Sequence, residues 1–112
     1  SIMSSEYNKI CHINAIPEQG SKGIRLNKND FFAVKSEGAV TVYYNSCPHL
    51  GSPLQWQSDQ FLNYDKSLIL CSTHGALFII ESGLCLAGPC QNQSLTMADF
   101  YIEDGQLYIN DI

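Results

Sequence analysis

The sequence predicts an all-β fold. Short runs rich in β-branched and aromatic residues recur along the chain, and Asn, Asp and Gly separate them. No stretch of ten or more residues combines a 3.6-residue apolar period with helix-capping signals. A hydrophobic content of 45% lets the chain bury enough apolar surface to fold, which excludes a disordered protein. At 112 residues we expect a single domain that spans residues 1–112.

The N-terminal half contains three predicted strands, at Gly23–Leu26, Phe31–Lys35 and Ala39–Tyr44. The segment Thr41-Val42-Tyr43-Tyr44 gives the strongest of these signals, because its residue types suit a pleated surface.

The C-terminal half contains three predicted hairpins, each with its own turn residues. Their turns are Asp65-Lys66-Ser67, Glu81-Ser82-Gly83 and Asp104-Gly105. Their arms are Phe61–Tyr64 with Leu68–Leu70, Ala76–Ile80 with Leu84–Leu86, and Leu95–Glu103 with Gln106–Asn110. Two loops without charged residues, Asn45–Ser58 and Ala87–Ser94, are the main irregular parts.

The charge balance limits the classes of partner. Six Lys and Arg against eleven Asp and Glu give a formal net charge of −5. We therefore expect no nucleic-acid partner and no anionic membrane surface. The longest apolar runs have the length of a strand, and Ser1–Ile10 has no signal-peptide pattern. A soluble, cytoplasmic protein is the expectation.

Five cysteines point toward metal or redox chemistry, since an odd number without a signal peptide argues against a secreted disulfide framework. Two short boxes hold the candidate ligands. The first is Cys47-Pro48-His49-Leu50-Gly51 and the second is Cys71-Ser72-Thr73-His74-Gly75. Each box pairs one thiol with one imidazole, so that a single loop can wrap its two ligands around one metal site.

Two thiolates and two imidazoles suit either zinc or an iron–sulfur centre. A structural zinc finger would normally take both cysteines from one loop and both histidines from another. Here each loop contributes one of each. This symmetry favours a [2Fe–2S] centre in which Cys47 and Cys71 hold one iron while His49 and His74 hold the other. A zinc site, or a site that has lost its metal, is the alternative.

These boxes resemble the defining pattern of the Rieske proteins. The resemblance continues in Gly51-x-x-Leu54, in Phe78 followed by Gly83, and in Gly88-Pro89, where the family carries a proline loop. It covers residues 45–90, which we expect to form the cluster-binding part. It implies an antiparallel β-sandwich with a small subdomain that carries two cluster-binding loops on a hairpin. One Rieske-type [2Fe–2S] cluster per chain is the implied cofactor, with Cys47, His49, Cys71 and His74 as its ligands.

Departures from the family pattern indicate a low-potential, ferredoxin-type member. Respiratory and photosynthetic Rieske subunits have an extra cysteine in each box, and those places hold Ser52 and Thr73 here. Where those subunits present serine and tyrosine hydroxyls, this chain has Ala76 and Phe78. Hydrogen bonds to cluster sulfurs stabilise the reduced form, so their loss predicts a potential on the order of −150 mV.

The resemblance implies an electron carrier and not an enzyme. We expect a monomer that shuttles electrons from a flavin-dependent NAD(P)H ferredoxin reductase to a terminal oxygenase. One alternative is the small Rieske-like subunit of an assimilatory NAD(P)H nitrite reductase, held by its large subunit. The alternative from a different class is a zinc-binding structural or interaction module.

We expect the three remaining cysteines to have structural roles. Cys11 and His12 are adjacent, and adjacent residues of a strand face opposite sides, so we expect no shared metal. Cys85 and Cys90 flank the expected proline loop, and in a reducing compartment we expect them as thiols.

Overall fold

The fold is known from a computed structural model that describes residues 7–27, 29–46, 61–71, 75–88 and 93–110. The strands of this part form three antiparallel sheets of three strands each. The first sheet has the order β1–β9–β8, with β1 at Asn8–His12, β9 at Gln106–Asn110 and β8 at Asp99–Glu103. The second has the order β2–β3–β4, with β2 at Gly20–Leu26, β3 at Asn29–Ser36 and β4 at Ala39–Tyr44. The third has the order β5–β6–β7, with β5 at Leu68–Cys71, β6 at Ala76–Ile79 and β7 at Cys85–Ala87. A 3-10 turn, η2 (Ile13–Ala15), follows β1.

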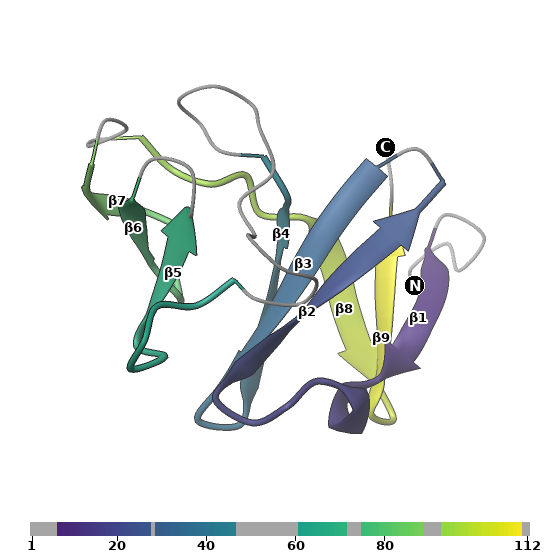
Figure 1. The fold of residues 1–112 in the computed structure, drawn as a ribbon. Coiled ribbons are helices and arrows are strands. Elements are labelled where there is room, and N and C mark those ends of the chain that lie inside the picture. Colours follow the sequence, from purple (N-terminus) through teal and green to yellow (C-terminus); the bar gives the residue numbers. More distant parts are fainter. Residues whose placement is uncertain (1–6, 28, 47–60, 72–74, 89–92, 111–112) are drawn as a thin grey trace.

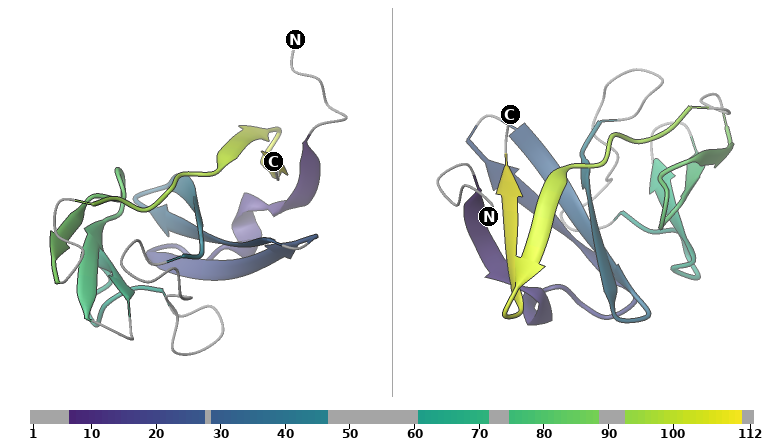
Figure 2. Two further views of the ribbon diagram at one scale, coloured as in Figure 1. Left: turned by 90° about the horizontal axis from the view of Figure 1, so that it is seen from above. Right: turned by 180° about the vertical axis from the view of Figure 1, so that it is seen from behind.

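The β2–β3–β4 sheet is the middle layer of the molecule. Figure 1 shows β5, β6 and β7 at one end and β8, β9 and β1 at the other, and the views of Figure 2 agree. The four consecutive residues Phe31, Phe32, Ala33 and Val34 of β3 are all fully buried. Alternate side chains of a strand point to opposite faces, and a run that is buried throughout therefore indicates a sheet covered on both sides.

The two faces of this middle sheet pack into two different cores. Phe31 and Ala33 belong to the core shared with the β1–β9–β8 sheet, and Phe32 and Val34 belong to the core shared with the β5–β6–β7 sheet. We call these the base core and the cluster-side core. The base core also contains Ile16, Ile24, Val42, Ala98, Leu107 and Ile109. The cluster-side core also contains Tyr43, Phe61, Ile69, Cys71, Ala76, Phe78, Ile80, Cys85 and Leu95.

The antiparallel all-β class predicted from the sequence is confirmed. The three expected strands of the N-terminal half and the hairpins at Glu81–Gly83 and Asp104–Gly105 are all present. The hairpin at Asp65–Ser67 has less strand pairing than expected. Its first arm forms only an isolated bridge, between Leu62 and Ile69.

The structure differs from the prediction at two strand boundaries and in one additional strand. Leu95–Glu103 is not one strand: Leu95 is buried in the cluster-side core, Met97 bridges to Tyr43, and β8 begins only at Asp99. This segment crosses from one outer sheet to the other, so that no single partner strand runs along all of it. Strand β2 begins three residues earlier than expected, at Gly20, and strand β1 was not predicted. Within the described residues, no helix is long and apolar enough to cross a membrane.

Candidate metal centre

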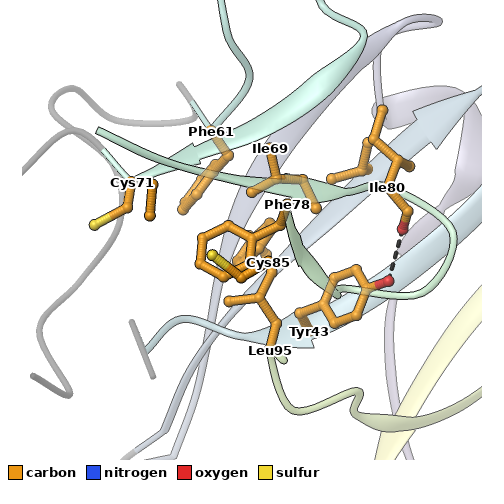
Figure 3. Close-up of a cluster of buried hydrophobic side chains, with 11 residues drawn as sticks. Tyr43, Phe61, Ile69, Cys71, Phe78, Ile80, Cys85 and Leu95 are labelled. Atoms are coloured by element: carbon orange, nitrogen blue, oxygen red, sulfur yellow. Dashed lines mark hydrogen bonds between the residues drawn. The ribbon is translucent and has the colours of Figure 1, made fainter. Parts of the chain in front are cut away.

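Cys71 is the last residue of β5 and is fully buried. It pairs with Ala76 across the β5–β6 hairpin. Its carbonyl oxygen accepts a hydrogen bond of 2.8 Å from the backbone N–H of Gly75, which closes the second box at its base. Gly75 has a φ of +70°, in the left-handed region that favours glycine. Figure 3 shows Cys71 at the margin of the cluster-side core, with its Sγ directed away from the rings of Phe61 and Phe78.

The nearest described residues before and after the first box have hydrogen bonds or buried ring contacts with the rest of the fold. Before it, the N–H of Asn45 donates to the carbonyl of Asp30 over 2.8 Å. After it, Phe61 is fully buried and stacks on Phe32, with 4.4 Å between ring centroids and an interplanar angle of 6°. The carbonyl of Phe61 accepts from the N–H of Leu70 over 2.9 Å. The chain that leaves the first box therefore runs beside β5 at the residue preceding Cys71.

Gly88, in the expected proline loop, lies directly against Ala76, the residue that follows the second box. A Cβ at Gly88 would stand 2.7 Å from the Cα of Ala76, and the φ of Gly88 is +108°. Only a glycine allows the two backbones to approach so closely. Gly88 is thus fixed next to the Cys71–Ala76 pair.

Tyr43 fixes the orientation of the β5–β6–β7 sheet relative to the middle sheet. Its hydroxyl donates a 2.6 Å hydrogen bond to the carbonyl of Ile80, in the turn after β6 (Figure 3). A Cβ at Gly83 would lie 2.8 Å from the Tyr43 ring, so a glycine is needed there as well. Burial and, to a smaller extent, the carboxylate of Glu81 raise the pKa of Tyr43 to about 12. The sequence placed Tyr43 in a predicted strand but gave no local signal for these contacts, because Ile80 and Gly83 lie far from Tyr43 along the chain.

Two hydrogen bonds join Gln19 and Ser21, at the start of β2, to the segment that leads into β5. The Gln19 Nε2 donates to the carbonyl of Lys66 over 3.0 Å, in the turn that leads into β5. The Oγ of Ser21 accepts from the N–H of Phe61 over 3.2 Å. Nothing in the local sequence marks these residues, because both contacts span 40 residues or more.

Of the four ligands predicted from the sequence, the structure describes Cys71. Cys47, His49 and His74 lie outside the described residues, as do Ser52, Thr73, Pro89 and Cys90. The part of the chain that is described contains no cluster of three or more His, Cys, Asp or Glu residues suited to a metal ion.

The remaining described cysteines and their neighbours have packing and capping contacts. Cys11 packs against the base core, and burial raises the pKa of its thiol while Lys22 lowers it. The Nδ1 of His12 accepts from the N–H of Asn14 over 3.0 Å and caps the 3-10 turn. The Sγ of Cys85 donates to the carbonyl of Ala87 over 3.2 Å inside the hairpin.

Ala76 and Phe78 are the positions at which the family resemblance implies hydroxyl donors in high-potential subunits. Both are fully buried, and both side chains share the face of the hairpin that carries Cys71. Neither side chain has a polar hydrogen to donate. The hairpin face that carries the Cys71 side chain therefore has no side-chain donor at these two positions.

The donor set fits an iron–sulfur cluster. Two thiols and two imidazoles are the donors of a histidine-ligated [2Fe–2S] centre. Cys71 is a buried thiol at a strand end, a soft donor with an apolar core behind it.

A family model described as the Rieske [2Fe-2S] domain matches residues 6–103. The chain belongs to the Rieske [2Fe-2S] domain family. A Rieske-type [2Fe–2S] cluster is its cofactor, which decides between the iron–sulfur and zinc interpretations. No curated protein sequence matches the chain.

Solved Rieske ferredoxins share the fold of this Rieske protein. The ferredoxin of carbazole 1,9a-dioxygenase from Nocardioides aromaticivorans IC177 is similar with a TM-score of 0.75 at 14% identity, covering 95% of this chain and 98% of that chain. The Sphingomonas yanoikuyae B1 ferredoxin has a TM-score of 0.74 at 24% identity, with coverages of 94% and 98%. A chain in the complex of reduced oxygenase and oxidized ferredoxin in carbazole 1,9a-dioxygenase has a TM-score of 0.74 at 17% identity, with coverages of 94% and 93%.

Proposed function

We propose that this Rieske protein is a one-electron carrier whose cluster is held by Cys47, His49, Cys71 and His74. The observation that carries the proposal is the position of Cys71, buried at the end of β5 beside the chain that returns from the first box. The cluster, when bound, supplies the one-electron couple. The protein holds the ligands in place and keeps water from the Cys71 side of the centre.

The proposed electron donor is a flavin-dependent NAD(P)H ferredoxin reductase, and the proposed acceptor is a terminal oxygenase. Support comes from the fold, which the chain shares over nearly its whole length with ferredoxins of carbazole 1,9a-dioxygenase. One of these ferredoxin structures was determined in complex with its oxygenase. This favours an oxygenase over a nitrite reductase large subunit as the acceptor.

The first test is a visible absorption and EPR spectrum of the purified protein, before and after dithionite. We expect a red-brown protein that bleaches on reduction and gives an EPR signal with an average g below the free-electron value. A protein that stays colourless after anaerobic reconstitution with iron and sulfide would contradict the carrier function.

The ligand assignment is tested with a matched pair of cysteine variants. Cys71→Ser is expected to abolish the Rieske spectrum, and Cys85→Ser, which changes a buried thiol in the same core, is expected to retain it. Circular dichroism checks that both variants are folded. Loss of the spectrum in both variants, or in neither, would refute the assignment of Cys71.

The partners are tested by reconstitution. NAD(P)H together with a ferredoxin reductase should reduce the cluster, and a terminal oxygenase should reoxidise it with turnover. Stable co-purification with a sirohaem protein would instead identify a nitrite reductase subunit.

A further inference from the structure

The outward face of the β5–β6–β7 sheet consists of aliphatic side chains. In this sheet Ile69, Cys71, Ala76 and Phe78 point into the cluster-side core, and the alternate residues therefore point the other way. We call the outward set the aliphatic face: Leu68, Leu70, Leu77, Ile79, Leu84 and Leu86.

An aliphatic outward face is unusual for a small antiparallel sheet. Such a sheet normally has one apolar face on the core and one polar face in water. Here Leu84 is 41% exposed and Leu86 is 46% exposed, and the stretch Ser67–Ile80 contains no Asp, Glu, Lys or Arg. The other four residues of the aliphatic face are partly exposed. Exposed apolar side chains grouped on one face mark interaction sites on soluble proteins.

The aliphatic face adjoins the candidate metal centre. Leu70 directly precedes Cys71, and Leu77 directly follows Ala76, its partner across the hairpin. A protein docked on this face would be separated from Cys71 by the thickness of one sheet, which is short enough for electron transfer. On the β1–β9–β8 sheet, at the other end of the molecule, a docked protein would be far from Cys71 (Figures 1 and 2).

Negative charge lies at the opposite end of the aliphatic face. Asp65 stands in the turn before β5 and Glu81 in the turn after β6, and antiparallel pairing brings both turns to the end away from Cys71. Hydrogen bonds from the Ser67 hydroxyl and N–H lower the pKa of the Asp65 carboxyl, which keeps it ionised. Both carboxylates are exposed.

We propose that the aliphatic face is the docking surface for the electron-transfer partner, a different protein with an apolar contact patch and Lys or Arg at one rim. This proposal rests on the carrier function proposed above. A second copy of the chain fits less well, because each copy carries a net charge of −5 and the two would repel. A heterologous partner with a basic rim complements both features of the surface.

The test compares two double variants with matched exposure. Leu84→Gln with Leu86→Gln changes the aliphatic face, and Met97→Gln with Ile102→Gln changes residues that are 47% and 40% exposed outside it. Cytochrome c serves as the probe, since it is a basic redox protein with an exposed haem edge. The rate at which dithionite-reduced protein, freed of excess dithionite, reduces cytochrome c is measured by stopped flow. Ferricyanide, a small oxidant that needs no docking surface, reports the intrinsic reactivity of the cluster.

We expect the Leu84/Leu86 variant to reduce cytochrome c about tenfold more slowly at an unchanged ferricyanide rate, visible spectrum and midpoint potential. The Met97/Ile102 variant should keep the parental rate. Glu81→Gln should slow the reaction at low ionic strength and not at high ionic strength.

Equal rates for the two double variants would overturn the proposal. So would wild-type protein that reduces ferricyanide but not cytochrome c. A dimer in sedimentation that the Leu84/Leu86 variant dissociates would assign the face to a second copy. Protein that reduces neither oxidant would instead refute the carrier function itself.

Discussion

At the level of single residues, Tyr43 connects the middle sheet to the sheet that carries Cys71. We expect Tyr43→Phe to lower the free energy of unfolding by about 1–3 kcal/mol, because the buried Ile80 carbonyl loses its donor. Urea unfolding followed by circular dichroism at neutral pH measures the loss. Tyr64→Phe is the matched control, since it removes a fully exposed phenol and leaves the bond to Ile80 intact. Equal effects of the two substitutions would contradict this role.

The same residue makes stability depend on alkaline pH. The pKa of Tyr43 is about 12 in the folded protein and about 10 in an unfolded chain, so between these values the unfolded state loses a proton that the folded state keeps. The free energy of unfolding therefore falls with rising pH from about 10 to 12, by up to about 1.4 kcal/mol per pH unit from this group. Urea titrations across this range should show a smaller slope in Tyr43→Phe than in the parent. Parallel slopes would show that Tyr43 ionises equally in both states.

The apolar positions beside Cys71 are expected to set the reduction potential. Ala76→Ser together with Phe78→Tyr introduces two hydroxyl donors on the face that carries the Cys71 side chain. Because donors stabilise the reduced cluster, the midpoint potential should rise, as measured by EPR-monitored redox titration. Ile69→Val, a buried change on the same face without a new donor, is the control. An unchanged potential in the double variant would refute the hydrogen-bond explanation.

At the level of elements, the loop after β7 and the start of β6 are packed backbone to backbone. Gly88→Ala should destabilise the protein by about 1–3 kcal/mol and perturb the visible spectrum, because the new Cβ would meet the Ala76 Cα at 2.7 Å. Gly38→Ala is the control. It also has a positive φ, +80°, but its Cβ would have nothing within 4 Å, so we expect only about 1 kcal/mol and a normal spectrum. Thermal melts and absorption spectra of both variants test this prediction, and equal effects of the two substitutions would contradict it.

The elements that the sequence predicted are those with local signals. Strands β3 and β4 have β-branched and aromatic runs, and two hairpins have Gly turns at Gly83 and Gly105 with positive φ. Strand β1 was missed because it is a polar edge strand with an irregular register between Lys9 and Cys11. The segment from Leu95 to Ala98 was misjudged because its apolar residues serve two cores in turn.

For the candidate site, too, the features with a local sequence signal could be predicted and the long-range contacts could not. The two boxes are sequence-local patterns, so they could be found without a structure. Of their four candidate ligands the structure describes Cys71, which is buried at the end of β5, and the assignment of all four stays a prediction. The contacts of Gln19, Ser21 and Tyr43 join residues 37 to 47 positions apart, and such pairs carry no local signal. The outward leucines were visible in the sequence, but their common face appeared only with the strand register.

At the level of the whole molecule, the four buried residues of β3 belong to two cores at once. A strand shared in this way couples the unfolding of both ends, so neither core can open while the other keeps its full packing. Native-state hydrogen exchange should therefore give the amides of β6 and β9 closely similar opening free energies.

Val34→Ala, a truncation on the cluster side of β3, should lower the opening free energies of both strands by about the same amount, roughly 2 kcal/mol. A decrease confined to β6 would show independent folding units. An equal decrease in both strands would mean that a destabilising substitution anywhere in the β1–β9–β8 sheet shortens the lifetime of the bound cluster, even where it leaves every ligand unchanged.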